Sequence, residues 1–186
     1  MTEKNLIRRR IALLKSKLTS IQKINDAKKV FTLIESSKCF NRCNNILLYY
    51  SLPDEVSTSL IIEKWHQSKQ LFLPRVNNNN LDIIKYDPQS TEIGSYNIIE
   101  PIGSPINISE IDLIIVPGVA FDKNGNRLGR GKGFYDRLLC NSTALKIGIG
   151  YDFQLVDRIT SEPHDIAMDA IITPTNSIIL NNTLWQ

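Results

Sequence analysis

The stretch DLIIVPGVAFDKNGNRLGRGKGFYD, residues 112–136, decides the fold class of this chain. Residues 112–116 form a short, strongly apolar run, which is typical of a buried strand, and Pro117 and Gly118 close it. A long loop follows, and a helix is predicted near residues 133–140. A buried strand that leads through a loop into a helix is a building unit of α/β proteins.

Three helices are predicted before this stretch, at residues 3–18, 20–36 and 57–65. The first two have apolar side chains at helical spacing, which gives each helix one face for the core. These faces consist of Ile7, Ile11, Leu14 and Leu18 in the first helix and of Ile24, Ala27, Phe31 and Ile34 in the second.

Further strands are predicted at residues 46–50, 71–73, 81–86, 146–150 and 170–173. Pro74 is expected to end the second of these, and the asparagine run at 77–80 is a turn signal, because Asn tolerates left-handed backbone. Strands that alternate with helices predict an α/β fold with a mostly parallel sheet flanked by helices. With no repeat and no linker-like segment, residues 1–186 are expected to form a single domain.

The composition is typical of a globular protein and argues against membrane-spanning and disulfide-rich classes. Hydrophobic residues make up 42% of the 186, an ordinary value for a globular chain, and the longest apolar runs are far too short to span a bilayer. No signal peptide is evident at the N-terminus, so a cytoplasmic location without membrane contact is expected. Three irregularly spaced cysteines argue against a disulfide framework.

Charge is unevenly distributed along the chain. Residues 1–42 hold 11 Lys and Arg against 3 Asp and Glu, whereas the remainder holds 11 against 16. A basic N-terminal region on an acidic body suits a polyanionic ligand, either a nucleotide or a nucleic acid.

The segment GRGKGFYD, residues 129–136, carries the clearest chemical signal. Its glycines allow backbone N–H groups to approach an anion closely, and the basic side chains between them add charge-assisted contacts to phosphate oxygens. Asp136 follows at once, where a phosphate-bound Mg²⁺ would need a carboxylate. The spacing fits neither the P-loop nor the dinucleotide fingerprint. From these residues alone the segment is a phosphate-binding loop, a basic surface loop or an RNA-binding turn.

Three other clusters are candidates for the same site. Lys4 and Arg8 share a helix face and offer a second anion contact. Tyr50 and Glu55 follow a buried strand, where α/β proteins place ligand-binding loops, although Pro53 and Asp54 alone would explain a turn there.

The last cluster lies in EPHDIAMDAIITP, residues 162–174. Asp165 and Asp169 share a face if this segment is helical, and either then approaches a metal. Asp165 alternatively caps the segment. His164 is a candidate ligand or base, although a surface histidine is the commoner case.

Taken together, these pieces resemble the 5-formyltetrahydrofolate cyclo-ligase family. The resemblance rests on YYSLPDEVST, LFLPRV, IDLIIVPGVAFDKNGNRLGRGKGFYDRLL and HDIAMDAIITP, which occur in the family's order and cover most of the chain. It implies an ATP-dependent ligase that converts 5-formyltetrahydrofolate and MgATP into 5,10-methenyltetrahydrofolate, ADP and phosphate.

The resemblance also implies roles for individual residues. Arg127 and Lys132 are the expected catalytic residues, Tyr50 and Glu55 the folate contacts together with Phe134 and Tyr135, and Asp136 and Asp165 the magnesium ligands. The ATP contacts are expected to be Lys4, Arg8, Arg127, Leu128, Gly129, Arg130, Gly131, Lys132, Gly133, Phe134 and Tyr135.

Two positions depart from the family pattern. Phe134 stands where many relatives have Tyr, so the hydroxyl is lost while a face for stacking remains. The sequence at 98–101 is Ile-Ile-Glu-Pro where Ile-Pro-Glu-Pro is more usual. A monomer that binds 5-formyltetrahydrofolate and ATP, and no nucleic acid, is expected. The alternatives are a nucleic-acid-binding module built on the basic loop and an α/β enzyme acting on a phosphorylated sugar.

Overall fold

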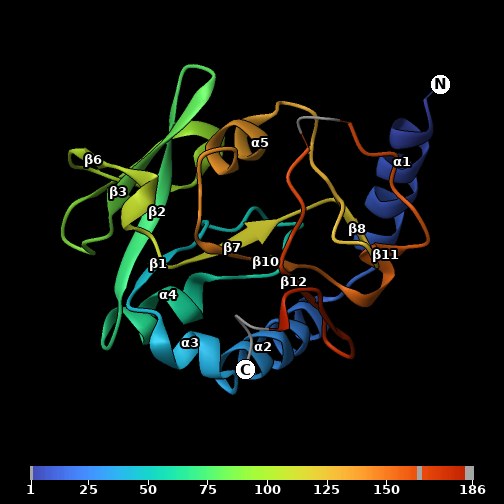
Figure 1. Cartoon of the computed structure of the whole chain (residues 1–186), viewed down its shortest axis with the longest axis horizontal. Coiled ribbons are helices and arrows are strands. Elements are labelled where there is room, and N and C mark those ends of the chain that lie inside the picture. The colour runs from blue at the N-terminus through green and yellow to red at the C-terminus, as the bar shows by residue number, and fades with distance from the viewer. Residues whose placement is uncertain (1, 163–164, 183–186) are drawn as a thin grey trace.

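The computed structural model describes residues 2–162 and 165–182, and it is built around one eight-stranded sheet (Figure 1). In spatial order the strands are β13 (Ser177–Ile179), β12 (Ala170–Ile172), β10 (Leu145–Ile149), β7 (Leu113–Pro117), β1 (Asn45–Leu47), β2 (Gln70–Asn77), β3 (Asn80–Lys85) and β6 (Pro105–Ile106). The five from β12 to β2 are parallel, and antiparallel strands lie outside them. The predicted fold class, α/β with a mostly parallel sheet, is confirmed.

Helices cover both faces of this sheet, and Figure 1 shows α2, α3 and α4 on one side and α5 on the other. Their bounds are Ser20–Glu35 for α2, Lys38–Arg42 for α3, Ser59–His66 for α4 and Phe134–Leu139 for α5. In β7, Leu113 and Ile115 pack toward the first group of helices, and Ile114 and Val116 pack toward α5. A strand buried on both faces is apolar at every position, which explains the continuous run that predicted it.

A smaller unit packs beside the main sheet. It consists of α1 (Glu3–Lys15) and a three-stranded sheet of β11 (Leu155–Val156), β8 (Ala120–Asp122) and β9 (Arg127–Leu128). Ile11 of α1 is buried there against Val119, Leu128 and Ile159. A two-stranded ribbon of β4 (Thr91–Ile93) and β5 (Ile99–Pro101) completes the strands of the described residues.

Three details of the predicted elements are wrong. The first helix ends at Lys15, so Leu18 lies beyond it and packs on the main core instead. Ile24 is 56% exposed, because the buried residues of α2 begin only at Ala27.

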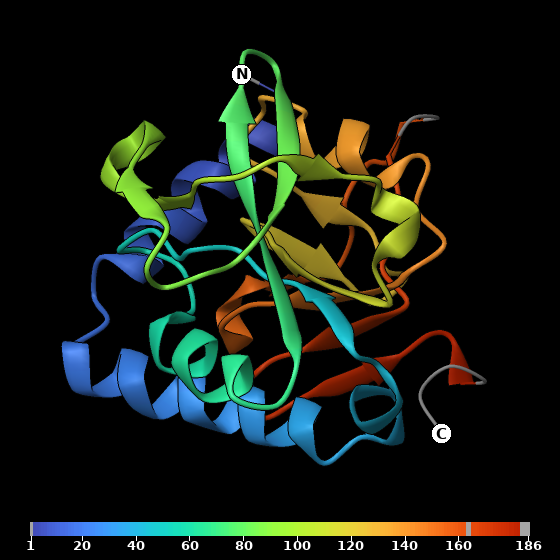
Figure 2. The same ribbon diagram turned by 90° about the vertical axis from the view of Figure 1, so that its left-hand side faces the viewer.

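The third is the end of the predicted strand at Pro74. β2 continues past Pro74 to Asn77 and forms a hairpin with β3 that extends beyond the other strands (Figure 2). β1 pairs with β2 only as far as Phe72, so at Pro74 the strand pairs with β3 alone. The proline is tolerated because no strand on the β1 side needs its missing N–H. The hairpin turn at Asn78 does adopt the left-handed backbone expected of asparagine, with φ of 53°. None of the helices within the described ranges is long and apolar enough to cross a membrane.

Candidate functional site

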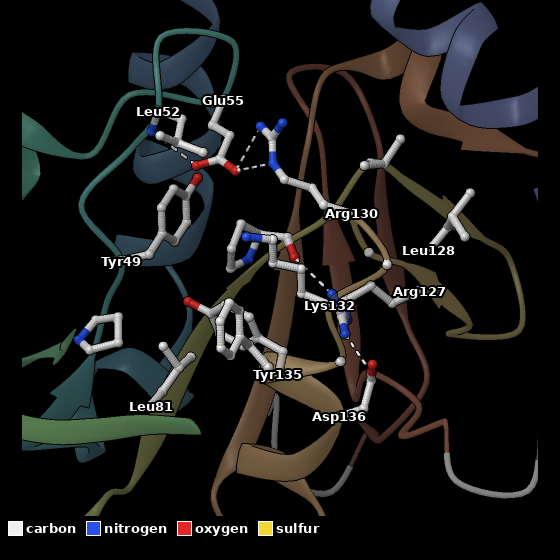
Figure 3. Close-up of a pocket in the computed structure, with 18 of the residues that line it drawn as sticks. Tyr49, Leu52, Glu55, Leu81, Arg127, Leu128, Arg130, Lys132, Tyr135 and Asp136 are labelled. Carbon is white, nitrogen blue, oxygen red and sulfur yellow. Dashed lines mark hydrogen bonds and ion pairs between the residues drawn. The ribbon is translucent and has the colours of Figure 1, made fainter. Parts of the chain in front are cut away.

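The principal pocket lies where the strand order reverses. β1 leads to β2 on one side, whereas β7 returns to the other side of β1, so the loops after β1 and β7 diverge and leave a crevice between them. A pocket of roughly 410 Å³ occupies this position (Figure 3). It is lined by the segments after both strands, by the hairpin of β2 and β3, and by α1. With the exception of Asp169, the candidate site residues predicted from the sequence within the described ranges line this pocket.

The glycine-rich segment forms one wall of the pocket. It leaves β9, which is held to β8 by pairing of Ala120 with Leu128, and it enters α5 at Phe134. Gly131 and Gly133 have φ of 98° and 68°, a backbone region in which a side chain is strained. These two glycines are therefore required by the path of the loop itself.

Arg127 and Asp136 tie the two ends of this segment together. Arg127 Nη2 lies 2.5 Å from Asp136 Oδ1, and the arginine side chain is only 5% exposed. Its guanidinium also lies over the ring of Tyr135, 5.6 Å from the centroid. Arg127 Nε is buried and has no hydrogen-bond partner among the described residues. Arg127 thus lines the pocket with a largely desolvated guanidinium, and its Nε–H is a hydrogen-bond donor with no partner among the described residues.

α1 contributes two cations to the same wall. Arg8 Nε donates to the carbonyl oxygen of Gly129 at 3.0 Å, which joins the helix directly to the loop. Lys4 Nζ donates to Glu162 at 2.7 Å and lies 3.6 Å from Asp165. The hydrogen bond that Lys4 donates to Glu162, aided by the charge of Asp165, raises the pKa of Lys4. Arg8 therefore meets the glycine-rich loop, whereas Lys4 contacts the segment that holds Glu162 and Asp165.

The opposite wall carries Glu55. Its Oε2 accepts the backbone N–H of Leu52 at 3.0 Å, and its Oε1 faces Arg130 of the glycine-rich loop, as Figure 3 shows. Tyr50 lines this end as predicted, beside Tyr49. The Tyr49 hydroxyl donates to the carbonyl oxygen of Val56 at 2.8 Å, so Tyr49 shapes the wall with its ring.

The hairpin of β2 and β3 adds an apolar surface to the pocket, and in Figure 3 Leu81 lies beyond the Tyr49 ring from Glu55. Pro74, Val76 and Leu81 line the pocket there. One end of the pocket is therefore rich in cations and backbone N–H groups, and the other pairs a carboxylate with apolar side chains and tyrosine rings.

Asp136 and Asp165 both line the pocket, but Asp169 does not. Residues 165–168 are not helical, which contradicts the shared face proposed for Asp165 and Asp169. Asp169 instead accepts a hydrogen bond from the backbone N–H of Lys146 at 2.9 Å, near the start of β10. Asp165 accepts the backbone N–H of Glu162 at 2.8 Å, as a capping residue would. His164 lies outside the described residues.

The described residues contain no cluster of three or more His, Cys, Asp or Glu side chains that would by itself hold a metal. The two carboxylates of Asp136 and Asp165 in one pocket do suit Mg²⁺, which usually keeps water and substrate oxygens as its other ligands. The metal-binding role of Asp136 and Asp165 stays a prediction.

Tyr96 is one of several pocket residues that the sequence did not predict, as are Tyr49, Pro74, Val76 and Leu81. It lies between β4 and β5 with φ of 60°, its hydroxyl contacts Lys132 Nζ, and the ammonium lies 4.8 Å from the centre of its ring. For the neighbouring segment 98–101 the sequence indicates only a departure from the family pattern and no contact with Lys132. Nothing in the spacing indicated that Tyr96 would reach Lys132.

Comparison with known proteins agrees with this geometry. The model of the 5-formyltetrahydrofolate cyclo-ligase family matches residues 1–174. A 5-formyltetrahydrofolate cyclo-ligase of Haemophilus influenzae is 32% identical, over 89% of this chain and 95% of its own, and one of Escherichia coli (strain K12) is 35% identical over 71% and 79%.

Solved structures give the same result. The 5,10-methenyltetrahydrofolate synthetase of Aquifex aeolicus superposes with a TM-score of 0.89 at 32% identity, covering 97% of this chain and 94% of its own. That of Mycoplasma pneumoniae gives 0.76 at 27% identity, covering 93% and 99%. The resemblance read from the sequence is thereby confirmed, and the chain belongs to the 5-formyltetrahydrofolate cyclo-ligase family.

Proposed function

We propose that this enzyme cyclises 5-formyltetrahydrofolate to 5,10-methenyltetrahydrofolate, with ATP converted to ADP and phosphate and with Mg²⁺ required. The observation that carries the proposal is the two-ended pocket, in which the phosphate-binding loop faces Glu55 and the apolar hairpin surface. An ATP-driven reaction on a heterocycle needs both subsites within reach of each other.

The formyl amide is a poor electrophile, so its oxygen must first become a leaving group. In the proposed first step the formyl oxygen attacks the γ-phosphorus of ATP, the bond from that phosphorus to the ADP oxygen breaks, and ADP leaves. Charge develops on the phosphoryl oxygens during this transfer. Lys132 and Arg127, with the N–H groups of the glycine-rich loop, are the groups that stabilise it.

In the second step the N10 amine attacks the activated formyl carbon. The carbon–oxygen bond breaks, phosphate departs, and N10 loses its proton as the methenyl bridge forms. Both reacting groups belong to the folate, so the protein supplies orientation and charge in place of a nucleophile of its own. Glu55 is suited to accept hydrogen bonds from the donor-rich edge of the pterin, and Tyr50 and Tyr135 flank it.

Asp136 and Asp165 are the residues that would hold Mg²⁺, which neutralises negative charge on the triphosphate when bound. Lys4, Arg8 and Arg130 are the side chains placed to bind the remaining phosphate charge. The other predicted nucleotide contacts act chiefly through the backbone of the loop; they are Leu128, Gly129, Gly131, Gly133, Phe134 and Tyr135.

The test is the near-UV absorbance of purified protein mixed with 5-formyltetrahydrofolate and MgATP. A growing methenyltetrahydrofolate band that needs ATP and disappears with EDTA supports the proposal. Absence of the band from folded protein would refute it. A parallel titration with single-stranded RNA and with a sugar phosphate tests the two alternatives, both of which predict binding that 5-formyltetrahydrofolate does not affect.

A further inference from the structure

Arg130 spans the pocket and joins its two walls. Its Nη2 lies 2.6 Å from Asp54 Oδ1 and 3.1 Å from Glu55 Oε1, although more than 70 residues separate it from both in the sequence. Figure 3 shows the Arg130 side chain reaching from the glycine-rich loop toward Glu55, with the pair joined by dashed lines. A cation of the phosphate-binding wall is therefore bound to the carboxylate of the opposite wall.

The contact leaves Glu55 little capacity for another donor. Oε2 already accepts the backbone N–H of Leu52, and Oε1 is the oxygen that Arg130 occupies. The Glu55 side chain is 11% exposed, whereas that of Arg130 is 47% exposed. A heterocycle that donates hydrogen bonds to Glu55 Oε1 must therefore displace the Arg130 guanidinium. Arg130 is the partner expected to move, because its side chain is the more exposed of the two.

Asp54 provides a second place for the same guanidinium. Its other oxygen lies 3.3 Å from Lys15 Nζ, and the Lys15 side chain is 5% exposed. Burial lowers the pKa of Lys15, and the charge of Asp54 opposes that shift. Lys15 thus fixes Asp54 in position, and Asp54 holds the Arg130 guanidinium beside the Glu55 segment when Glu55 itself releases it.

The opposite end of Arg130 belongs to the phosphate-binding loop, between Gly129 and Gly131. A triphosphate bound there competes with Glu55 for the guanidinium, since an arginine fork binds phosphate and carboxylate oxygens alike. The contacts with Glu55 are 3.1 and 3.4 Å long and are therefore weaker than the contact with Asp54.

We propose that Arg130 couples the two substrates, because nucleotide phosphates draw it away from Glu55 and so free the carboxylate for the pterin, while Asp54 positions it for the exchange. The inference rests on the proposed function and adds a reason for cooperative binding. Since coupling between two ligands is reciprocal, each substrate tightens the binding of the other.

Calorimetric titration with 5-formyltetrahydrofolate tests the coupling. The affinity for the folate is measured with and without the non-hydrolysable β,γ-methylene analogue of ATP and Mg²⁺. In the wild type the analogue is expected to raise folate affinity about two- to fivefold, the range for a partly exposed ion pair. In Arg130→Gln, folate alone is expected to bind about that much more tightly than to the wild type, and the analogue is expected to add nothing. Asp54→Asn shifts the guanidinium toward Glu55 and is expected to weaken folate binding.

Lys17→Gln is the matched control, because Lys17 is exposed, lies outside the pocket and carries the same charge. It is expected to bind both ligands as the wild type does. Unchanged or weaker folate binding in Arg130→Gln, from protein with wild-type circular dichroism, overturns the inference. If the wild type nevertheless forms methenyltetrahydrofolate, the coupling role of Arg130 is refuted and the proposed function stands. A wild type that binds no 5-formyltetrahydrofolate refutes the proposed function as well.

Discussion

Replacing Asp136 with alanine isolates its ion pair with Arg127, at the base of the glycine-rich loop. The paired atoms of Arg127 and Asp136 are 2.5 Å apart, and the side chains are 5% and 24% exposed. Removal of one partner of a fully buried pair costs about 3–5 kcal/mol, because the other charge is left uncompensated, whereas exposed pairs contribute about 0.2–1 kcal/mol. The partial exposure of Asp136 places the expected loss in the free energy of unfolding at about 2–3 kcal/mol.

Urea unfolding followed by far-UV circular dichroism measures this loss, with no nucleotide or metal present, so the result does not depend on the metal-binding role of Asp136. Asp136→Asn keeps an acceptor oxygen without the charge and is expected to lose about half as much. Asp157→Ala is the control, since Asp157 is exposed and its replacement is expected to change stability by less than about 0.5 kcal/mol. Stability of Asp136→Ala within that margin of the wild type would refute the reasoning.

Three further predictions concern the loop, the core and pH. Lys132→Ala is expected to lower the rate of methenyltetrahydrofolate formation by about 100-fold or more, with unchanged circular dichroism; near-normal turnover would remove Lys132 from the mechanism. Gly148→Ala is expected to cost about 1–3 kcal/mol in urea unfolding, because a methyl group there would lie 2.5 Å from the buried ring of Phe121, and a neutral result would contradict that packing. Burial opposes ionisation of Asp152, but hydrogen bonds led by the Thr173 hydroxyl outweigh it and hold the pKa below its ordinary 3.8. Asp152→Asn is therefore expected to be less stable than the wild type at neutral pH, and the difference in thermal melting should vanish as the pH falls below 3.8; a pH-independent difference would contradict this.

The sequence predicts the centre of this molecule better than its edges. β7 is apolar at every position because helices cover both its faces, and that burial can be read directly from the residues. The short strands β6, β8 and β13 carry no comparable pattern, because each is recognisable only through the neighbour with which it pairs. Pro74 shows the same limit, since its place inside β2 depends on where β1 stops.

The candidate site follows a similar division. Composition and local spacing make the glycine-rich loop a candidate anion site, and the family resemblance supplies the residues predicted to join it, such as Lys4 and Glu55. What the sequence does not predict is which groups meet across the pocket. The contacts of Arg130 with Asp54 and of Lys132 with Tyr96 join segments that are far apart along the chain, so only the packed fold determines them.

The position of α1 has a consequence for how the chain folds during synthesis. α1 is translated before the strands of the main sheet, yet the side chains that bury Ile11 lie between Val119 and Ile159 and emerge from the ribosome much later. Its apolar stripe therefore remains exposed while the strands of the main sheet assemble, and it docks only after residue 159 has been made. Because α1 carries Lys4 and Arg8, the enzyme is expected to complete the proposed nucleotide subsite late, after the central sheet has already folded.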